Sequence, residues 1–401
     1  MTVRAPATST TTSSAPTAMQ TPEPAEIIAS LRMAEARLVA VATGGGARAI
    51  ARLVTTPGAS AVVLEGLVPS AREAVDRLLG GRQESYCSPR TARRLAIAAW
   101  QRAVDDGTPP AHAIGAAVVA SLKTVAPKRG THRVIVAIQT LAATSLAALE
   151  LEKEARTRDA EEDVAAGLLL RELEAAARPG TIPQSPAGLR TGERVERECT
   201  GARPEWKPLL TGTCRAVGIG TEASAPGPGR LVFPGSFDPL HDGHRALARL
   251  AEEIAERPVE FELSIANVDK PPLDYHEIEA RTAQFAGRPL WLTRAATFLE
   301  KLSLFPHGTF VLGADTFVRL ADPRYYGGSA AAAAAAARTI ADQASGLIVF
   351  GRVRDGVFVE PAALDAPQPL RDISYFVSQR EFRNDISSTA LRREQTACDA
   401  S

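Results

Sequence analysis

The chain has 401 residues, which is enough for two or three domains with separate hydrophobic cores. Its 46 Lys and Arg residues balance 46 Asp and Glu residues, so the formal net charge is zero. This neutrality argues against nucleic acid or an anionic membrane surface as a partner.

Residues 1–24 are rich in Thr, Ser, Ala and Pro and carry only two charged side chains, so we expect a disordered tail. No apolar run approaches the roughly 18 residues that span a bilayer, and we predict a soluble, cytoplasmic protein. The cysteines have no Cys-x-x-Cys spacing and no histidine nearby that would complete a metal site. We therefore expect free thiols and no protein-bound metal from Cys87, Cys199, Cys214 and Cys398.

Segment 25–177 alternates short apolar runs with helix-length periodic stretches, as is typical of an α/β domain. The runs 38–41, 61–65 and 133–137 each predict a buried strand. Segment 149–177 has leucines on one face and Glu and Arg on the other, which predicts a long amphipathic helix.

Segment 178–229 is rich in Pro, Gly, Thr and Ser and ends in the run Ala-Pro-Gly-Pro-Gly at 225–229, which indicates a domain boundary. Trp206 and the pair Leu209-Leu210 are apolar residues within this linker. We expect part of the linker to pack against a domain.

A second α/β unit is predicted for residues 230–394, followed by a short tail at 395–401. The eight alanines at 330–337 follow Ser329, a good N-cap residue, and predict a helix. The apolar runs that predict strands are 230–233, 259–265, 310–313 and 346–350. The predicted fold class is α/β, with two domains of which the second is a doubly wound sheet.

The clearest motif is Gly-Ser-Phe-Asp-Pro-Leu-His-Asp-Gly-His at 235–244, between a predicted strand and a predicted helix. Unpaired backbone N–H groups and the helix dipole make such a junction favourable for an anion. His241 and His244 are three residues apart, so on the first turn of a helix both rings lie on the same side. Gly243 between them leaves room for a phosphate to approach the backbone.

A second motif, Ile-Ser-Ser-Thr-Ala-Leu-Arg at 386–392, lies near the C-terminus. Ser and Thr hydroxyls at a helix start can donate to phosphate oxygens, and Arg392 lies one turn further along. Two anion-binding motifs in one α/β domain fit a long polyanion such as a nucleoside triphosphate.

The motif His-x-Gly-His at 241–244, followed about 140 residues later by the motif at 386–392, resembles the HxGH nucleotidylyltransferase superfamily. The run Gly313-Ala314-Asp315 is similar to a segment of nicotinate- and nicotinamide-mononucleotide adenylyltransferases. The resemblance covers residues 230–393. It implies a Rossmann-like fold, Mg²⁺ supplied with ATP, and attack of a substrate phosphate on the α-phosphorus with release of pyrophosphate.

For this reaction the candidate catalytic residues are His241, His244 and Arg392, because the enzyme must align an already ionised phosphate and neutralise the triphosphate. The candidate nucleotide-binding residues are Gly235, Ser236, Phe237, Gly243, Gly313, Asp315, Ile386, Ser387, Ser388 and Thr389. Lys270 follows a predicted strand and is a candidate for substrate binding, although a surface lysine before a proline turn explains it equally well.

Our primary hypothesis is transfer of AMP from ATP to nicotinate or nicotinamide mononucleotide, a step of NAD biosynthesis. The partners are then ATP and a small phosphorylated acceptor, and a homo-oligomer is left open. The alternatives are a cytidylyltransferase for a phospho-alcohol and a nucleotide-binding sensor without turnover. The motif at 386–392 favours adenylyl transfer over cytidylyl transfer.

Segment 26–177 resembles the C-terminal domain of the competence/damage-inducible CinA family, whose catalytic members deamidate nicotinamide mononucleotide. Matching motifs, in the same order, are Ala42-Thr43-Gly44-Gly45 and the segments 57–60, 64–69, 86–88, 127–133 and 153–162.

Three positions differ from the amidase pattern. Val41 stands where the family has Ser, Ser70 aligns with a Tyr, and Val75 aligns with a Lys. A valine can be neither nucleophile nor base, so the sequence argues against amidase activity unless Thr43 or Ser70 substitutes. The alternatives for this domain are phosphate binding at the glycine turn 44–46, oligomerisation, regulation, or a structural role.

Overall fold

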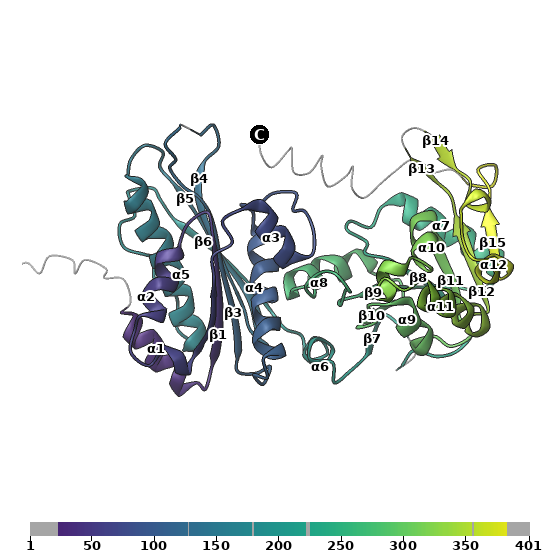
Figure 1. The fold of residues 1–401 in the computed structure, drawn as a ribbon, viewed down its shortest axis with the longest axis horizontal. Coiled ribbons are helices and arrows are strands. Elements are labelled where there is room, and N and C mark those ends of the chain that lie inside the picture. The colour runs from purple at the N-terminus through teal and green to yellow at the C-terminus, as the bar shows by residue number, and fades with distance from the viewer. Residues whose placement is uncertain (1–22, 127, 179, 222–224, 355–356, 383–401) are drawn as a thin grey trace, which may run out of the picture.

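The computed structural model describes residues 23–126, 128–178, 180–221, 225–354 and 357–382. It contains two large β-sheets, each with helices on both faces, and a two-stranded ribbon (Figure 1). This is the two-domain α/β architecture that the sequence predicts. The motif at 386–392, the tail 395–401 and residues 1–22 of the predicted N-terminal tail lie outside the described residues.

The first sheet has six strands, and its inner strands β1 and β3 are buried on both faces. β1 pairs in parallel with β2 and β3, whereas β3, β4, β5 and β6 pair antiparallel. In spatial order the strands are β2 (Val63–Leu67), β1 (Arg37–Thr43), β3 (Ala113–Ser121), β4 (His132–Gln139), β5 (Ala143–Leu151) and β6 (Val195–Gly201).

Two separate apolar cores cover the faces of this sheet (Figure 1). One face carries α1 (Pro24–Met33), α2 (Ala47–Val54) and α5 (Arg158–Ala177), with the short η1 (Ala59–Ala61). The other face carries α3 (Arg72–Leu79) and α4 (Pro89–Asp105).

The helix predicted for residues 149–177 is shorter than expected. Residues 149–151 complete β5, because Leu149 pairs with Val134 on one side and with Val195 on the other. The helix then begins after Thr157, whose hydroxyl accepts a hydrogen bond from the N–H of Ala160 at 3.2 Å.

The second sheet has seven strands, all parallel except β7, which pairs antiparallel with β10. In spatial order they are β15 (Ser374–Val377), β12 (Gly346–Phe350), β11 (Thr309–Gly313), β8 (Leu231–Pro234), β9 (Val259–Ser264), β10 (Leu290–Thr293) and β7 (Ala216–Ile219). A two-stranded ribbon, β13 (Arg352–Arg354) and β14 (Val357–Val359), follows β12.

Helices cover both faces of this sheet as well. α7 (Asp242–Ala255), α8 (Tyr275–Thr282) and η2 (Ala283–Phe285) contribute to the core on one face. The other face has α9 (Phe298–Leu304), α10 (Ala314–Arg319), α11 (Ala330–Gln343) and α12 (Gln368–Asp372), with η3 (Pro323–Tyr326) and η4 (Pro361–Ala363). The alanine run forms α11, and Ser329 accepts the N–H of Ala332 as its N-cap.

The segment between the predicted domains contributes an edge strand to each sheet. β6 closes the first sheet and β7 closes the second, and α6 (Trp206–Thr211) lies between them in sequence. Trp206, Leu209 and Leu210 are completely or almost completely buried. Within the described ranges, no helix is both long enough and apolar enough to span a bilayer.

Helix α8 joins the two domains. It belongs to the second domain, yet it contacts β5 and β6 of the first (Figure 1). The apolar core on the α4 side of the first sheet continues into residues of α6, α7 and α8. The two domains therefore share one hydrophobic core.

Candidate functional site

The Gly235–His244 motif and the Gly313–Asp315 segment meet at the same edge of the second sheet. β8 and β11 are adjacent and parallel, with Leu231 opposite Thr309 and Val232 opposite Phe310. The chain runs from β8 through α7 to β9 on one side, whereas β11 and β12 lie on the other. The carboxyl ends of β8 and β11 thus flank the topological switch point, where open α/β sheets bind ligands.

Phe237 anchors the loop between β8 and α7. Its backbone is in the left-handed region, with φ of 44°, and its side chain is 1% exposed. The ring makes edge contacts with Phe233, Phe261 and Phe285. The sequence predicts that Phe237 binds nucleotide, but in the structure its side chain packs in the core and fixes the loop.

Gly235 is required by the close approach of that ring. A Cβ atom at this position would lie 2.6 Å from the Phe237 ring. The Gly235 N–H donates to the backbone carbonyl of Glu262 in β9 at 3.0 Å, which fixes the start of the loop.

His241 and His244 lie side by side at the start of α7. Their rings stack, with centroids 3.8 Å apart and an angle of 27° between the planes. The His241 backbone N–H donates to Nδ1 of His244 at 3.3 Å. In neutral His244 the proton therefore sits on Nε2, which leaves Nε2–H as a donor for a ligand.

The surroundings keep both imidazoles neutral. Burial, with smaller contributions from the neighbouring His241 and Arg245, lowers the pKa of His244 to about 3. Burial also lowers the pKa of His241. Its Nδ1 atom is buried without a hydrogen-bond partner among the described residues. In the tautomer that carries a proton on Nδ1, His241 thus has a donor without an acceptor.

Asp315, predicted to bind nucleotide, lies in the first turn of α10, directly after β11. Its carboxylate accepts a hydrogen bond from Arg352, and both side chains are about half exposed. Gly313 is exposed and Gly243 is buried.

Lys270 is exposed in the loop between β9 and α8, at the same sheet edge as the histidines. Ile386, Ser387, Ser388, Thr389 and Arg392 fall outside the described residues, so their role stays a prediction. In the part of the chain that is described, no group of three or more His, Cys, Asp or Glu side chains could hold a metal ion.

Three residues that the sequence analysis does not identify hold the Gly235–Leu240 loop. Arg281 Nη1 donates to the carbonyl of Ser236 at 3.0 Å. Gln284 donates to the carbonyl of Phe237 at 3.2 Å and accepts the N–H of Leu240 at 2.6 Å. Asp238 accepts a hydrogen bond from Arg90 of the first domain. Arg281, Gln284 and Arg90 lie outside the motifs, so sequence pattern alone gives no signal for these three residues.

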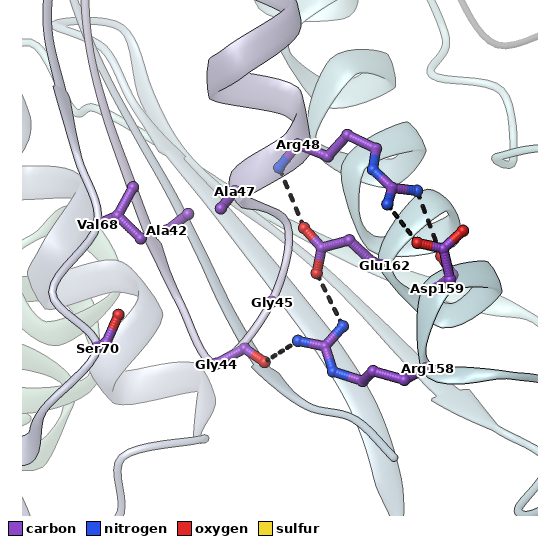
Figure 2. Close-up of a pocket in the computed structure, with 10 residues that line it drawn as sticks. All are labelled: Ala42, Gly44, Gly45, Ala47, Arg48, Val68, Ser70, Arg158, Asp159 and Glu162. Atoms are coloured by element: carbon purple, nitrogen blue, oxygen red, sulfur yellow. Dashed lines mark hydrogen bonds and ion pairs between the residues drawn. The ribbon is translucent and has the colours of Figure 1, made fainter. Parts of the chain in front are cut away.

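The first domain has a cavity of about 540 Å³ beside its glycine turn (Figure 2). Glu162 of α5 accepts hydrogen bonds from the backbone N–H groups of Gly46 and Arg48, at 3.0 and 3.1 Å. These are the N–H groups at the start of α2 that a phosphate would use. A phosphate would have to displace the Glu162 carboxylate, which argues against phosphate binding at this turn.

Two of the three positions that differ from the amidase pattern are not among the residues that line this cavity. Val41 and Val75 are buried in the core, and Thr43 donates its hydroxyl to the carbonyl of Pro69 at 2.7 Å. Ser70 lies on the opposite side of the cavity from Glu162 (Figure 2). No Lys, His or Tyr is among its lining residues, so none of them provides a base beside Ser70.

The second domain thus combines a mostly parallel sheet, a loop at its topological switch point and a pair of stacked histidines at the start of α7. Residues 232–394 match the cytidylyltransferase-like family. This match supports nucleotidyltransferase activity in general, without specifying the base or the acceptor.

Several solved structures resemble the N-terminal part of the chain. A competence-damaged protein (CinA) superfamily protein from Enterobacter cloacae is 16% identical, with a TM-score of 0.35, over 42% of this chain and 99% of that chain. A competence or damage-inducible protein from Enterobacter asburiae is 20% identical, with a TM-score of 0.33, over 39% and 99%. Competence/damage inducible protein CihA from Agrobacterium tumefaciens is 19% identical, with a TM-score of 0.31, over 39% and 97%. No curated protein sequence matches the chain.

Proposed function

We propose that the chain is an adenylyltransferase that transfers AMP from ATP to a pyridine mononucleotide and releases pyrophosphate. The observation that carries this proposal is the stacked pair His241 and His244 at the carboxyl end of β8, beside the Gly313–Asp315 segment at the end of β11. Magnesium enters as part of the Mg·ATP substrate, which binds the metal through phosphate oxygens.

The reaction needs no protein nucleophile. An oxygen of the acceptor phosphate, already ionised at neutral pH, forms a bond to the α-phosphorus, and the bond from that phosphorus to the bridging oxygen breaks. The negative charge that develops on the leaving pyrophosphate is stabilised by N–H donors already in place. The Nε2–H group of His244 and the N-terminal turn of α7 supply such donors.

The acceptor is proposed on sequence resemblance. The Gly313–Asp315 segment is similar to that of pyridine-mononucleotide adenylyltransferases. Residues 26–177 resemble, in their motifs, a family with members that act on the same mononucleotide. Lys270 lies at the same sheet edge and is our candidate for the acceptor phosphate.

The test is pyrophosphate release by the full-length protein with Mg²⁺, ATP or CTP, and a panel of acceptors that includes both pyridine mononucleotides and phosphocholine. In His244→Ala we expect kcat to fall about a hundredfold or more, because one transition-state donor is lost. The matched control is His112→Ala, which removes a partly exposed histidine of the first domain.

Turnover with ATP and a pyridine mononucleotide, lost in His244→Ala and kept in His112→Ala, is the expected result. Turnover with CTP and phosphocholine would instead make the protein a cytidylyltransferase. Tight ATP binding without turnover on any acceptor would make it a nucleotide sensor. An unchanged kcat in His244→Ala would remove that residue from the site.

A further inference from the structure

A cluster of charged side chains crosses the interface between the two domains. The first domain contributes Arg90 and Arg93 from α4, and the second contributes carboxylates of Asp238, Asp274 and Glu277. Arg93 and Asp274 are 8% and 1% exposed, respectively, and Arg90 is 33% exposed. The cluster is thus buried at Asp274 and reaches the surface at Arg90.

Arg90 connects this cluster to the loop that precedes the two histidines. It donates to Asp238 in the Gly235–Leu240 loop, and its Nε lies 3.3 Å from Glu277 of α8. Arg281 also contacts both carboxylates, at 3.5 Å from Asp238 and 2.6 Å from Glu277. Arg90 of the first domain therefore contacts the loop directly.

The first domain also contacts helix α8, whose Arg281 donates a hydrogen bond to the loop. Tyr275 is fully buried, donates its backbone N–H to Thr144 at 3.1 Å and donates its hydroxyl to the carbonyl of Leu141 at 2.9 Å. Its ring stacks on Trp206 with 6.1 Å between centroids. Arg281 and Gln284 extend from this segment to the loop. The first domain therefore supports the loop in two ways, directly through Arg90 and indirectly through α8.

A third contact involves the loop that carries Lys270. A Cβ atom on Gly80, the residue that ends α3, would lie 1.4 Å from the carbonyl oxygen of Asp269. The backbones are thus in direct contact at this point. The first domain contacts both loops that leave the carboxyl ends of β8 and β9.

We propose that the first domain positions the Gly235–Leu240 loop of the transferase site, and that Arg90 is the positioning residue that transmits this effect. The effect on turnover rests on the proposed function, whereas the effect on the loop itself does not. Without Arg90, Asp238 and Glu277 still have Arg281, and Glu277 still has Arg93 at 3.7 Å. Arg90→Ala should therefore fold.

The experiment compares wild type, Arg90→Ala, Arg90→Lys and Arg102→Ala as full-length proteins. Arg102 lies on the same helix α4 but pairs with Glu65 of the first domain, at 2.7 and 2.8 Å, so its removal is a matched control. The first readout is amide hydrogen exchange over residues 235–241, with β12 as an internal reference. The second is kcat and KM for pyrophosphate release.

In Arg90→Ala we expect exchange over 235–241 to become at least about fivefold faster, while exchange in β12 stays at the wild-type rate. We expect kcat to fall between about tenfold and a hundredfold with little change in KM for ATP, because the loop presents the histidines. Arg90→Lys should fall between wild type and Arg90→Ala, and Arg102→Ala should match wild type.

Wild-type exchange over 235–241 in Arg90→Ala would overturn the proposal, and so would an equal acceleration in Arg102→Ala. If the wild-type protein turns over no acceptor, the proposed function fails. The exchange rates then still decide whether Arg90 positions the loop.

Discussion

His244 illustrates at the scale of one residue how position sets chemistry. Its ring is packed between His241 and Phe237, and the backbone N–H of His241 occupies its Nδ1 atom. The spacing of three residues on a helix predicts the adjacency of the two rings, which the structure confirms. The lowered pKa of His244 depends on burial by tertiary contacts, for which the sequence carries no pattern.

This burial predicts a pH dependence of stability. The pKa of His244 is about 3 in the folded protein and near 6.5 when unfolded, so the unfolded state binds more protons between these values. The contribution to stability is complete above pH 6.5 and is lost as the pH falls toward 3, with a slope of at most about 1.4 kcal/mol per pH unit. His241 contributes with the same sign.

Urea unfolding of wild type and His244→Gln between pH 7 and 4.5 measures this slope. We expect the free energy of unfolding to fall less steeply with acidification in His244→Gln than in wild type. Equal slopes in the two proteins would show that His244 titrates normally in the folded state.

At the scale of elements, the end of α3 and the loop after β9 depend on each other. Gly80 ends α3 with φ of 66°, and the carbonyl of Asp269 lies where its Cβ would be. Gly107 ends the turn after α4 with φ of 91°, and no atom lies within 4 Å of its Cβ position. The two glycines share a left-handed backbone and differ in what surrounds them.

Gly80→Ala and Gly107→Ala should therefore differ. Both substitutions carry the strain of a left-handed alanine, about 1–2 kcal/mol. Gly80→Ala should cost about 1–3 kcal/mol more, because the chain at Asp269 has to move. Thermal unfolding gives the difference in stability, and an increased KM for the acceptor in Gly80→Ala alone would follow from displacement of Lys270. If the two variants are equally destabilised, the chain at Asp269 moves away from the new methyl group at little cost in free energy.

The sequence predicts three strands of the first sheet and four of the second, because apolar runs such as 346–350 and 310–313 form largely buried strands of parallel sheets. The strands of these sheets that the sequence does not predict are β3, β5, β6, β7, β10 and β15, and in β3 the Ala and Gly residues have low strand propensity. Arg281 and Gln284, which hold the Gly235–Leu240 loop, are not predicted because they come from α8 and η2, which carry no motif. Periodicity reveals a helix face but not which loop the face supports.

At the scale of the whole molecule, two arginines of α4 have different roles in the domain interface. Arg90 is one of several partners of Glu277, whereas Arg93 is the ion-pair partner of Asp274. Although burial raises the pKa of the Glu277 carboxyl, Arg281, Arg90 and Arg93 lower it to about 2. Burial raises the pKa of Asp274, and Arg93 opposes this only in part. Glu277 has three positive partners, so it tolerates the loss of one, whereas Asp274 depends on Arg93, whose Nε lies 3.4 Å away.

Arg93→Met should therefore destabilise the whole protein. It leaves the buried Asp274 carboxylate without its partner, at a cost of about 3–5 kcal/mol. Arg102→Met removes an exposed ion pair of the same helix and should cost at most about 1 kcal/mol. Thermal unfolding of the two full-length variants measures the difference, and similar Tm values for both would contradict the dependence of Asp274 on Arg93.

The segment 178–229 between the domains limits where the chain can be cut to separate them. Its strands β6 and β7 each form the last strand of a sheet, and β7 covers β10, whose four residues are all buried. A fragment that began at residue 230 would leave β10 as an apolar edge strand with unpaired backbone groups, which is a template for aggregation. The second domain therefore begins in sequence at or before Ala216, inside the segment whose composition resembles a linker. A gene fusion or fission that moved the second domain would have to include β7 with it.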